Sequence, residues 1–215
     1  MRTSDDEVPS RREPGDRALT ANLRREASGQ LETVRGPAGR SRRRRWLLLV
    51  AVLSLVVAFL CLSCALFVWP SADRPEHVDA VLSLNGANEN LREQRALALV
   101  RAGYANALLF SEGHYPQVPC PKVPHVAVVC FIPNPARTVG EVEFAVRYAA
   151  RRGWHSIMVV PGLPQATRAR LLMARCFKGH TVVVPAAAPP LFELVGEVIY
   201  EWAAMAKALV VDRGC

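Results

Sequence analysis

The feature that most constrains this chain is an apolar segment of 24 residues, Trp46 to Trp69, which contains no charged side chain. At about 1.5 Å per residue, a helix of this length crosses the roughly 30 Å hydrocarbon layer of a bilayer. A tryptophan at each end suits the membrane–water interface. A buried core helix is rarely apolar on every face, and a cleaved signal peptide has a shorter leader and a better cleavage site than Pro70-Ser71-Ala72. The sequence therefore predicts an uncleaved transmembrane helix.

The charges on the two sides of this segment predict its orientation. Arg42 to Arg45 directly precede it, whereas only Arg74 lies close behind it. Basic residues next to a membrane span are retained in the cytoplasm. We therefore expect a single-pass protein of the plasma membrane, with residues 1–45 as a cytoplasmic tail. Residues 70–76 would be a linker, and the domain that follows would be extracytoplasmic.

The basic excess of the chain, a net charge of +8, lies mainly in this tail. Residues 1–45 hold 12 arginines against 7 acidic residues and few apolar ones, a composition typical of disorder. The arginine cluster can contact anionic lipid, although topology alone accounts for it. Nucleic-acid binding would need basic side chains on the folded part, so no nucleic-acid partner is expected.

After residue 76, short apolar runs alternate with segments of helical periodicity. This pattern is typical of a parallel sheet that is covered by helices on both faces. With right-handed crossovers, it predicts a Rossmann-like, three-layer α/β domain over residues 77–211, with a five-stranded, mostly parallel sheet. The predicted strands are 78–84, 107–110, 125–132, 156–160 and 181–184, and the predicted helices are 89–102, 138–152, 165–177 and a last one after Pro189-Pro190.

The predicted topology locates a ligand site, because ligands of open parallel sheets bind beyond the carboxyl ends of the strands. Asn85-Gly86 ends the first strand abruptly, and both residue types tolerate left-handed backbone angles. Exposed amides at the helix starts that follow would attract anions. The alternative is that Asn85-Gly86 is merely a tight turn. The loops expected at this edge are 85–88, 111–114, 134–138 and 161–165.

Several side chains near this edge are candidates for ligand binding. The guanidinium groups of Arg92, Arg95 and Arg168 could bind a phosphate or carboxylate, or they could lie on a solvated face or pair with nearby glutamates. Glu141 could be a base, although Thr138 and Glu141 have the spacing of a capping box, which would also explain them. The predicted ligand-binding residues are Asn85, Gly86, Arg92, Arg95, Ser111, Glu112, Gly113, Thr138, Glu141, Gln165 and Arg168.

The other reactive residue types give weaker signals. Ser111 does not lie in the Gly-x-Ser-x-Gly elbow of a hydrolase nucleophile, and His114 is the histidine expected at the ligand edge. No Cys or His spacing favours a metal site. Four cysteines follow the span, which allows three pairings if they are oxidised. A loop position for Cys120 and a strand end for Cys130 are consistent with a bridge between them.

The order of these motifs over residues 77–210 resembles the SanA/YdcF/ElyC-like envelope proteins (domain of unknown function 218). That family has an Asp, an apolar strand and a Gly-rich loop, then an Arg about eleven residues before a Gly. Ser-Gly-Gly, Thr-x-x-Glu/Asn and Arg-Ala motifs follow. The residues that match are Asp79, Val81 to Leu84, Asn85-Gly86, Arg92, Gly103, Ser111-Glu112-Gly113, Thr138, Glu141, Val159-Val160 and Arg168-Ala169.

The chain departs from this family pattern at several loop positions. Asn85 and Glu112 replace glycines, the family's Thr-Ser falls on Pro161-Gly162, and its His falls on Gln165. An amide does not titrate near neutrality, so Gln165 cannot perform acid–base work.

The resemblance implies a membrane-anchored, Rossmann-like protein of cell-envelope or peptidoglycan biogenesis. Its partners would be the membrane and a small anionic ligand or lipid-linked precursor. Three functions stay open: an enzyme acting on a phosphorylated or nucleotide-linked glycan or lipid precursor, a non-catalytic binding or regulatory module, and a transferase. The transferase would use S-adenosylmethionine, which some family members are reported to bind.

Overall fold

The computed structural model describes residues 38–86, 88–112, 120–212 and 215. The predicted tail up to residue 37, together with Gly113 and His114, lies outside the described residues. The chain divides after Val56 into two compact units.

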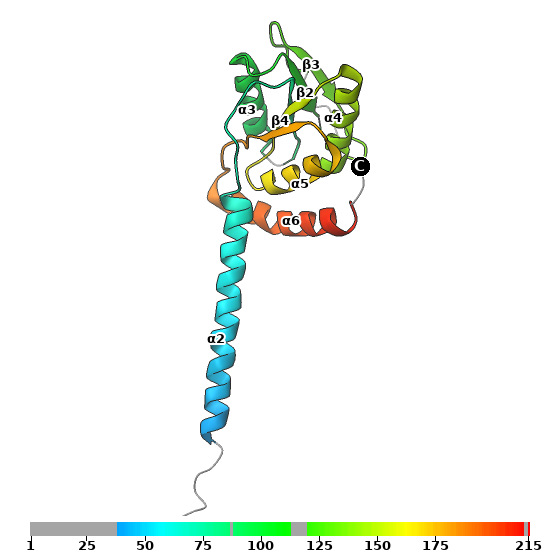
Figure 1. The fold of residues 1–215 in the computed structure, drawn as a ribbon. Helices are drawn as coiled ribbons and strands as arrows, with labels where there is room; N and C mark the ends of the chain where they lie inside the picture. Colours follow the sequence, from blue (N-terminus) through cyan, green and yellow to red (C-terminus); the bar gives the residue numbers. More distant parts are fainter. Residues whose placement is uncertain (1–37, 87, 113–119, 213–214) are drawn as a thin grey trace, which may run out of the picture. The chain divides into compact units, whose positions relative to one another are not determined.

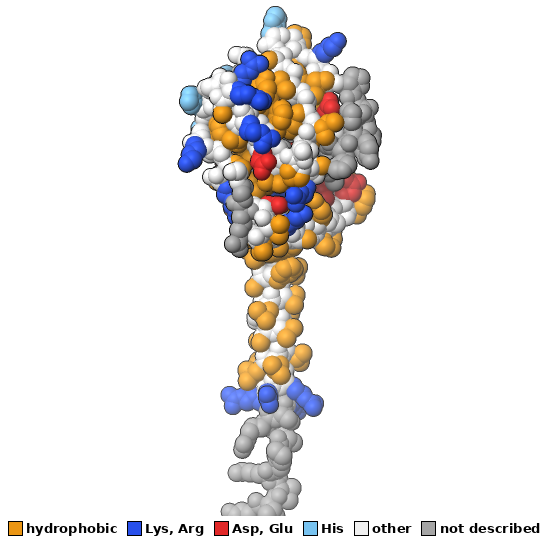
Figure 2. Space-filling model, turned by 90° about the vertical axis from the view of Figure 1, so that its right-hand side faces the viewer, with side chains coloured by type: hydrophobic (Ala, Val, Ile, Leu, Met, Phe, Trp, Pro, Cys, Tyr) orange, Lys and Arg blue, Asp and Glu red, His pale blue; other side chains and the backbone are white. Residues whose placement is uncertain are grey.

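The apolar segment forms the helix α2 (Ala38–Ser63), which passes into a π-helical turn, η1 (Cys64–Val68). Within the described part of the chain, Arg42–Val68 is one helix long and apolar enough to cross a membrane, as the sequence predicts. Figure 2 shows hydrophobic side chains along this helix and Lys or Arg side chains at its amino end.

The domain is built on a five-stranded sheet in which every neighbouring pair of strands is parallel. The strand order is β3-β2-β1-β4-β5, and the central register pairs Leu82 with Leu109 on one side and with Val159 on the other. This confirms the predicted fold class. The strands are β1 (Ala80–Ser83), β2 (Ala107–Ser111), β3 (Ala127–Phe131), β4 (Ser156–Val160) and β5 (His180–Val183).

Helices cover both faces of the sheet, which explains why β1 and β2 are buried along their whole length. One face packs against α3 (Glu89–Arg101). The other packs against α4 (Thr138–Arg152) and α5 (Ala166–Cys176). The last helix, α6 (Leu191–Val210), packs outside α5 and against η1. Figure 1 shows α6, in orange to red, running along α5.

The segment predicted as a linker, residues 70–76, is bonded to the edge strand β5. The Asp73 N–H donates to the Val183 carbonyl at 2.9 Å, and the Val183 N–H donates to the Asp73 carboxylate at 2.7 Å. Arg170 of α5 forms an ion pair with the same carboxylate at 3.0 Å. These contacts attach the chain to the domain directly after the apolar segment.

Two disulfides close loops on the domain. One joins Cys120 to Cys130, as the sequence suggested. The other joins Cys176, at the end of α5, to Cys215. Cys61 and Cys64, in the apolar segment, are free thiols.

Candidate functional site

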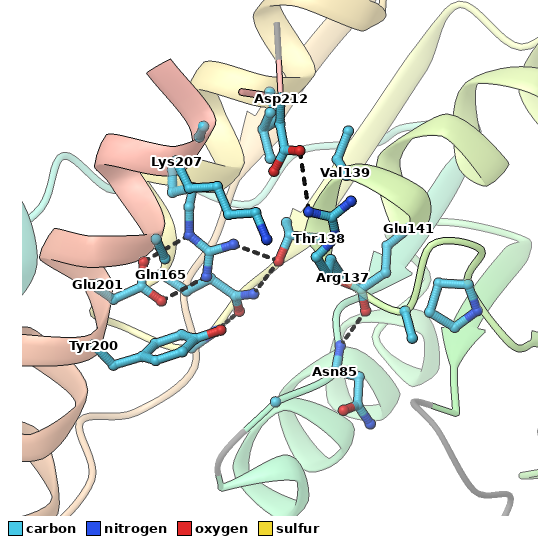
Figure 3. Close-up of a pocket in the computed structure, with 18 of the residues that line it drawn as sticks. Asn85, Arg137, Thr138, Val139, Glu141, Gln165, Tyr200, Glu201, Lys207 and Asp212 are labelled. Carbon is cyan, nitrogen blue, oxygen red and sulfur yellow. Dashed lines mark hydrogen bonds and ion pairs between the residues drawn. The ribbon is translucent and has the colours of Figure 1, made fainter. Parts of the chain in front are cut away.

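A cavity of about 450 Å³ lies at the carboxyl edge of the sheet, beside the loops that follow β1 and β4. These two strands are neighbours, but the chain leaves β1 toward β2 on one side and β4 toward β5 on the other. Ligands of open α/β sheets bind at such a reversal of strand order. The loop after β1, the start of α4, the start of α5 and one face of α6 form the walls (Figure 3).

The carboxamide of Gln165 joins three segments beside the cavity. Its Nε2 donates to Thr138 Oγ1 at 2.9 Å, and its Oε1 accepts from the Gly162 N–H at 3.2 Å. Arg92 Nη1 lies 3.4 Å from the same Oε1. Gln165 thus holds the β4 loop, the first turn of α4 and a side chain of α3 together. An amide suits this position because it donates and accepts at once.

A buried ion pair connects α5 to α6 on the opposite wall. Arg168 Nε and Nη2 donate to the two carboxylate oxygens of Glu201 at 2.8 and 2.7 Å, and its Nη1 donates to Thr138 Oγ1 at 2.8 Å. Both side chains are less than a tenth exposed. The charge of Arg168, predicted as an anion contact, is therefore balanced by Glu201, while its position beside the cavity matches the prediction.

The predicted capping box at the start of α4 is wrong. Arg137 is the N-cap residue and makes no side-chain capping bond, and Thr138 is the first residue of the helix. Thr138 Oγ1 instead accepts from Gln165 and Arg168, and the Glu141 carboxylate accepts from the Asn85 N–H at 2.6 Å. Both side chains bind groups that are distant in sequence, so neither satisfies the amides of its own helix.

Glu141 is a buried carboxyl group in the wall of the cavity. Burial raises its pKa above the ordinary value of 4.5, because the charged form loses its hydration. Ser111 and the Asn85 amide act against this rise in pKa, as do the positive charges of Arg92 and Arg168. The Ser111 Oγ is buried and has no hydrogen-bond partner among the described residues.

Charged side chains from α6 and the residues after it line the cavity entrance. Arg137 and Asp212 form an ion pair at 3.2 Å. Glu197 accepts a hydrogen bond from the Asn88 side chain at 2.7 Å. Lys207 forms no ion pair within the described part of the chain, and Figure 3 shows its side chain extending over the cavity.

Gly86 brings the loop after β1 close to Arg92. Its φ is +140°, a conformation that side chains rarely adopt, and a Cβ atom there would lie 2.8 Å from Arg92 Nη1. The Asn85-Gly86 turn reverses the chain and also leaves room for the Arg92 guanidinium.

The structure brings most of the predicted ligand-binding residues to the cavity. Ser111 is buried behind Glu141 at the end of β2. Arg95 is exposed one turn further along α3 than Arg92, and neither Arg95 nor Glu112 lines the cavity. The predicted residues that line it are Asn85, Gly86, Arg92, Thr138, Glu141, Gln165 and Arg168.

The sequence prediction missed the α6 wall, namely Glu197, Tyr200, Glu201 and Lys207. The signal was present as polar residues at helical spacing on an otherwise apolar helix.

Among the described residues, one group lies close enough together to hold a metal ion: Glu112, Cys120 and Cys130. The two cysteines are bonded to each other, so neither offers a thiolate to a metal.

No protein-family model, no curated protein and no solved structure matches this chain.

Proposed function

We propose that this chain is a membrane-anchored domain of cell-envelope biogenesis that binds a small anionic ligand, phosphorylated or nucleotide-linked, at the cavity beside β1 and β4. The order of the sequence motifs resembles that of the envelope family, which supports a role in cell-envelope biogenesis. The apolar helix supports the anchor, and the arginines before it support an extracytoplasmic domain.

The observation that carries the ligand class is the position of Lys207. Arg168 is balanced by Glu201 and Arg137 by Asp212, whereas the Lys207 ammonium extends over the cavity without an ion pair among the described residues. A phosphate or carboxylate in the cavity would supply the missing counter-charge. A charge-assisted hydrogen bond of this kind contributes about 1.5–3 kcal/mol.

A non-catalytic binding or regulatory module is the second candidate, and Gln165 favours it. Gln165 joins the β4 loop, the start of α4 and a side chain of α3, yet its amide can neither take nor give a proton near neutral pH. The carboxyl group that could exchange a proton is Glu141, whose raised pKa suits a general acid or base.

The first experiment measures binding to the full chain in lipid nanodiscs. The probes are a prenyl monophosphate, a nucleotide-sugar and S-adenosylmethionine, and thermal shift is the readout. We expect a phosphorylated probe to bind and Lys207→Gln to weaken it about tenfold or more, from the loss of one charge-assisted hydrogen bond.

The matched control is Arg147→Gln, which removes one exposed positive charge on α4 outside the cavity and should leave affinity within about twofold. Failure of every anionic probe to bind, or equal weakening by the two substitutions, would refute the proposed ligand class.

A second measurement separates an enzyme from a binding module. The bound probe is incubated with the chain and its mass is followed over time. An enzyme that uses Glu141 would convert the probe and lose this activity in Glu141→Gln while still binding it. A binding module would release the probe unchanged.

A further inference from the structure

One face of α6 is apolar and exposed along the whole helix. Phe192, Val195, Ile199 and Val210 are 77%, 55%, 69% and 63% exposed. Residues three or four positions apart share a helix face, and at this spacing the exposed Ala203 and Ala206 complete the stripe. The charged residues of α6 lie on its other sides.

The opposite face of α6 packs against the domain. Leu194, Met205 and Ala208 are buried, and Glu201 forms its ion pair with Arg168 of α5. The exposed apolar stripe therefore faces away from the domain. Rotating α6 to hide the stripe would break the buried ion pair.

Trp202 fixes α6 to the last turns of the membrane-crossing segment. Its ring stacks on Phe59 at a centroid distance of 5.1 Å and meets Phe67 edge-on at 5.3 Å. Its Nε1 donates to Ser63 Oγ at 3.0 Å. All three partners belong to the candidate span Arg42–Val68.

These contacts hold part of α6 beside the membrane-crossing segment, and therefore close to the lipid that would surround it. Phe59 lies nine residues before Val68, which is roughly 13 Å along a helix axis. Trp202, stacked on Phe59, therefore lies beside the last turns of the span rather than beyond its end. Trp69, which directly follows the span and is 75% exposed, is of an aromatic type enriched at membrane interfaces.

We infer that α6 is an interfacial membrane helix, and that its apolar stripe lies in the lipid surface around the carboxyl end of the span. Lipid is the occupant because the stripe continues the apolar surface of the span through Trp202, and because it carries no charge to match a polar partner. An amphipathic helix with one uncharged apolar face binds a bilayer in this way. The inference does not depend on what the cavity binds.

The test uses the full chain in vesicles of phosphatidylcholine and phosphatidylglycerol. In a Cys61→Ser/Cys64→Ser background, Ile199→Cys carries an environment-sensitive fluorophore. The matched control is Arg147→Cys on α4, whose side chain is 60% exposed. We expect nitroxide lipids, labelled at a shallow acyl position, to quench residue 199 about twofold or more and to leave residue 147 unchanged. Aqueous iodide should quench residue 147 far more than residue 199.

Two results would overturn the inference. Equal iodide quenching at residues 199 and 147 would place the stripe in water. Protection of residue 199 from both iodide and lipid quenchers would show that protein covers it, and energy transfer between two labelled chains would then identify a second copy. If Ile199→Cys disturbs folding, Val195→Cys gives the same readout from the same face.

Discussion

Arg168 on α5 and Glu201 on α6 bind each other through two parallel hydrogen bonds of 2.8 and 2.7 Å, in a site where both side chains are nearly inaccessible to water. Thr138 of α4 completes the coordination of the guanidinium. Three helices therefore meet at one ion pair, which also forms a wall of the cavity.

Breaking this pair should be costly, because a single substitution leaves an uncompensated buried charge. We expect Arg168→Met or Glu201→Leu alone to lower the free energy of unfolding by about 3–5 kcal/mol, and the double substitution to recover much of the loss. Urea unfolding of the full chain in detergent measures both. Losses below about 1 kcal/mol in the single variants would contradict the buried geometry.

Glu141 should make stability depend on pH in the direction opposite to an ordinary salt-bridged carboxylate. Its folded pKa is raised, so the folded state binds the proton more tightly than the unfolded state does. The resulting stability is fully present below the ordinary value of 4.5 and is lost as the pH rises through the folded pKa.

The substitution Glu141→Gln removes this titration while keeping an acceptor for the Asn85 N–H. We expect its free energy of unfolding, relative to the wild type, to increase from pH 4.5 toward neutrality. Glu143→Gln, on the same helix and partly exposed, is the matched control. A difference between Glu141→Gln and the wild type that is independent of pH would show that Glu141 titrates normally.

The disulfides predict a specific pattern of thiol reactivity. Without reduction, an alkylating reagent should modify two cysteines of the denatured chain, Cys61 and Cys64, and after reduction all six. Mass spectrometry counts the adducts on protein isolated from cells. Six adducts without reduction would show a reducing compartment and would refute the proposed extracytoplasmic orientation.

Gly86→Ala should weaken ligand binding, because the new methyl group would displace the Arg92 guanidinium, 2.8 Å away. Gly103→Ala is the matched control: it also has positive φ, at +83°, but its Cβ would meet nothing within 4 Å. Both should lose about 1–3 kcal/mol of stability from backbone strain, and only Gly86→Ala should lose affinity for the phosphorylated probe. Equal affinities of the two variants for the probe would show that the position of Arg92 does not affect binding.

The sequence predicted the fold well because the pattern of each strand and helix is local. Val81 to Leu84 is apolar throughout because both faces of β1 are covered, and Gly153 ends α4 with a positive φ of 70°. Topology then located the cavity without any motif.

Long-range pairing accounts for what the sequence did not predict. Thr138 and Glu141 have capping-box spacing, but their partners come from α5 and the loop after β1. Nothing near Arg168 in the sequence points to Glu201, 33 residues further along. The packing of α6 against α5 decides these pairings, and the periodicity of α6 alone predicts only that it is amphipathic.

The packing of Trp202 against Phe59, Ser63 and Phe67 bears on how this protein can be dissected. Excision just after the hydrophobic segment, at residue 70, would remove all three partners and expose the indole. It would also remove the packing of α6 against η1. The compact carboxyl-terminal unit begins at Val57, inside the hydrophobic segment, so a fragment that begins after this segment would lack part of the unit.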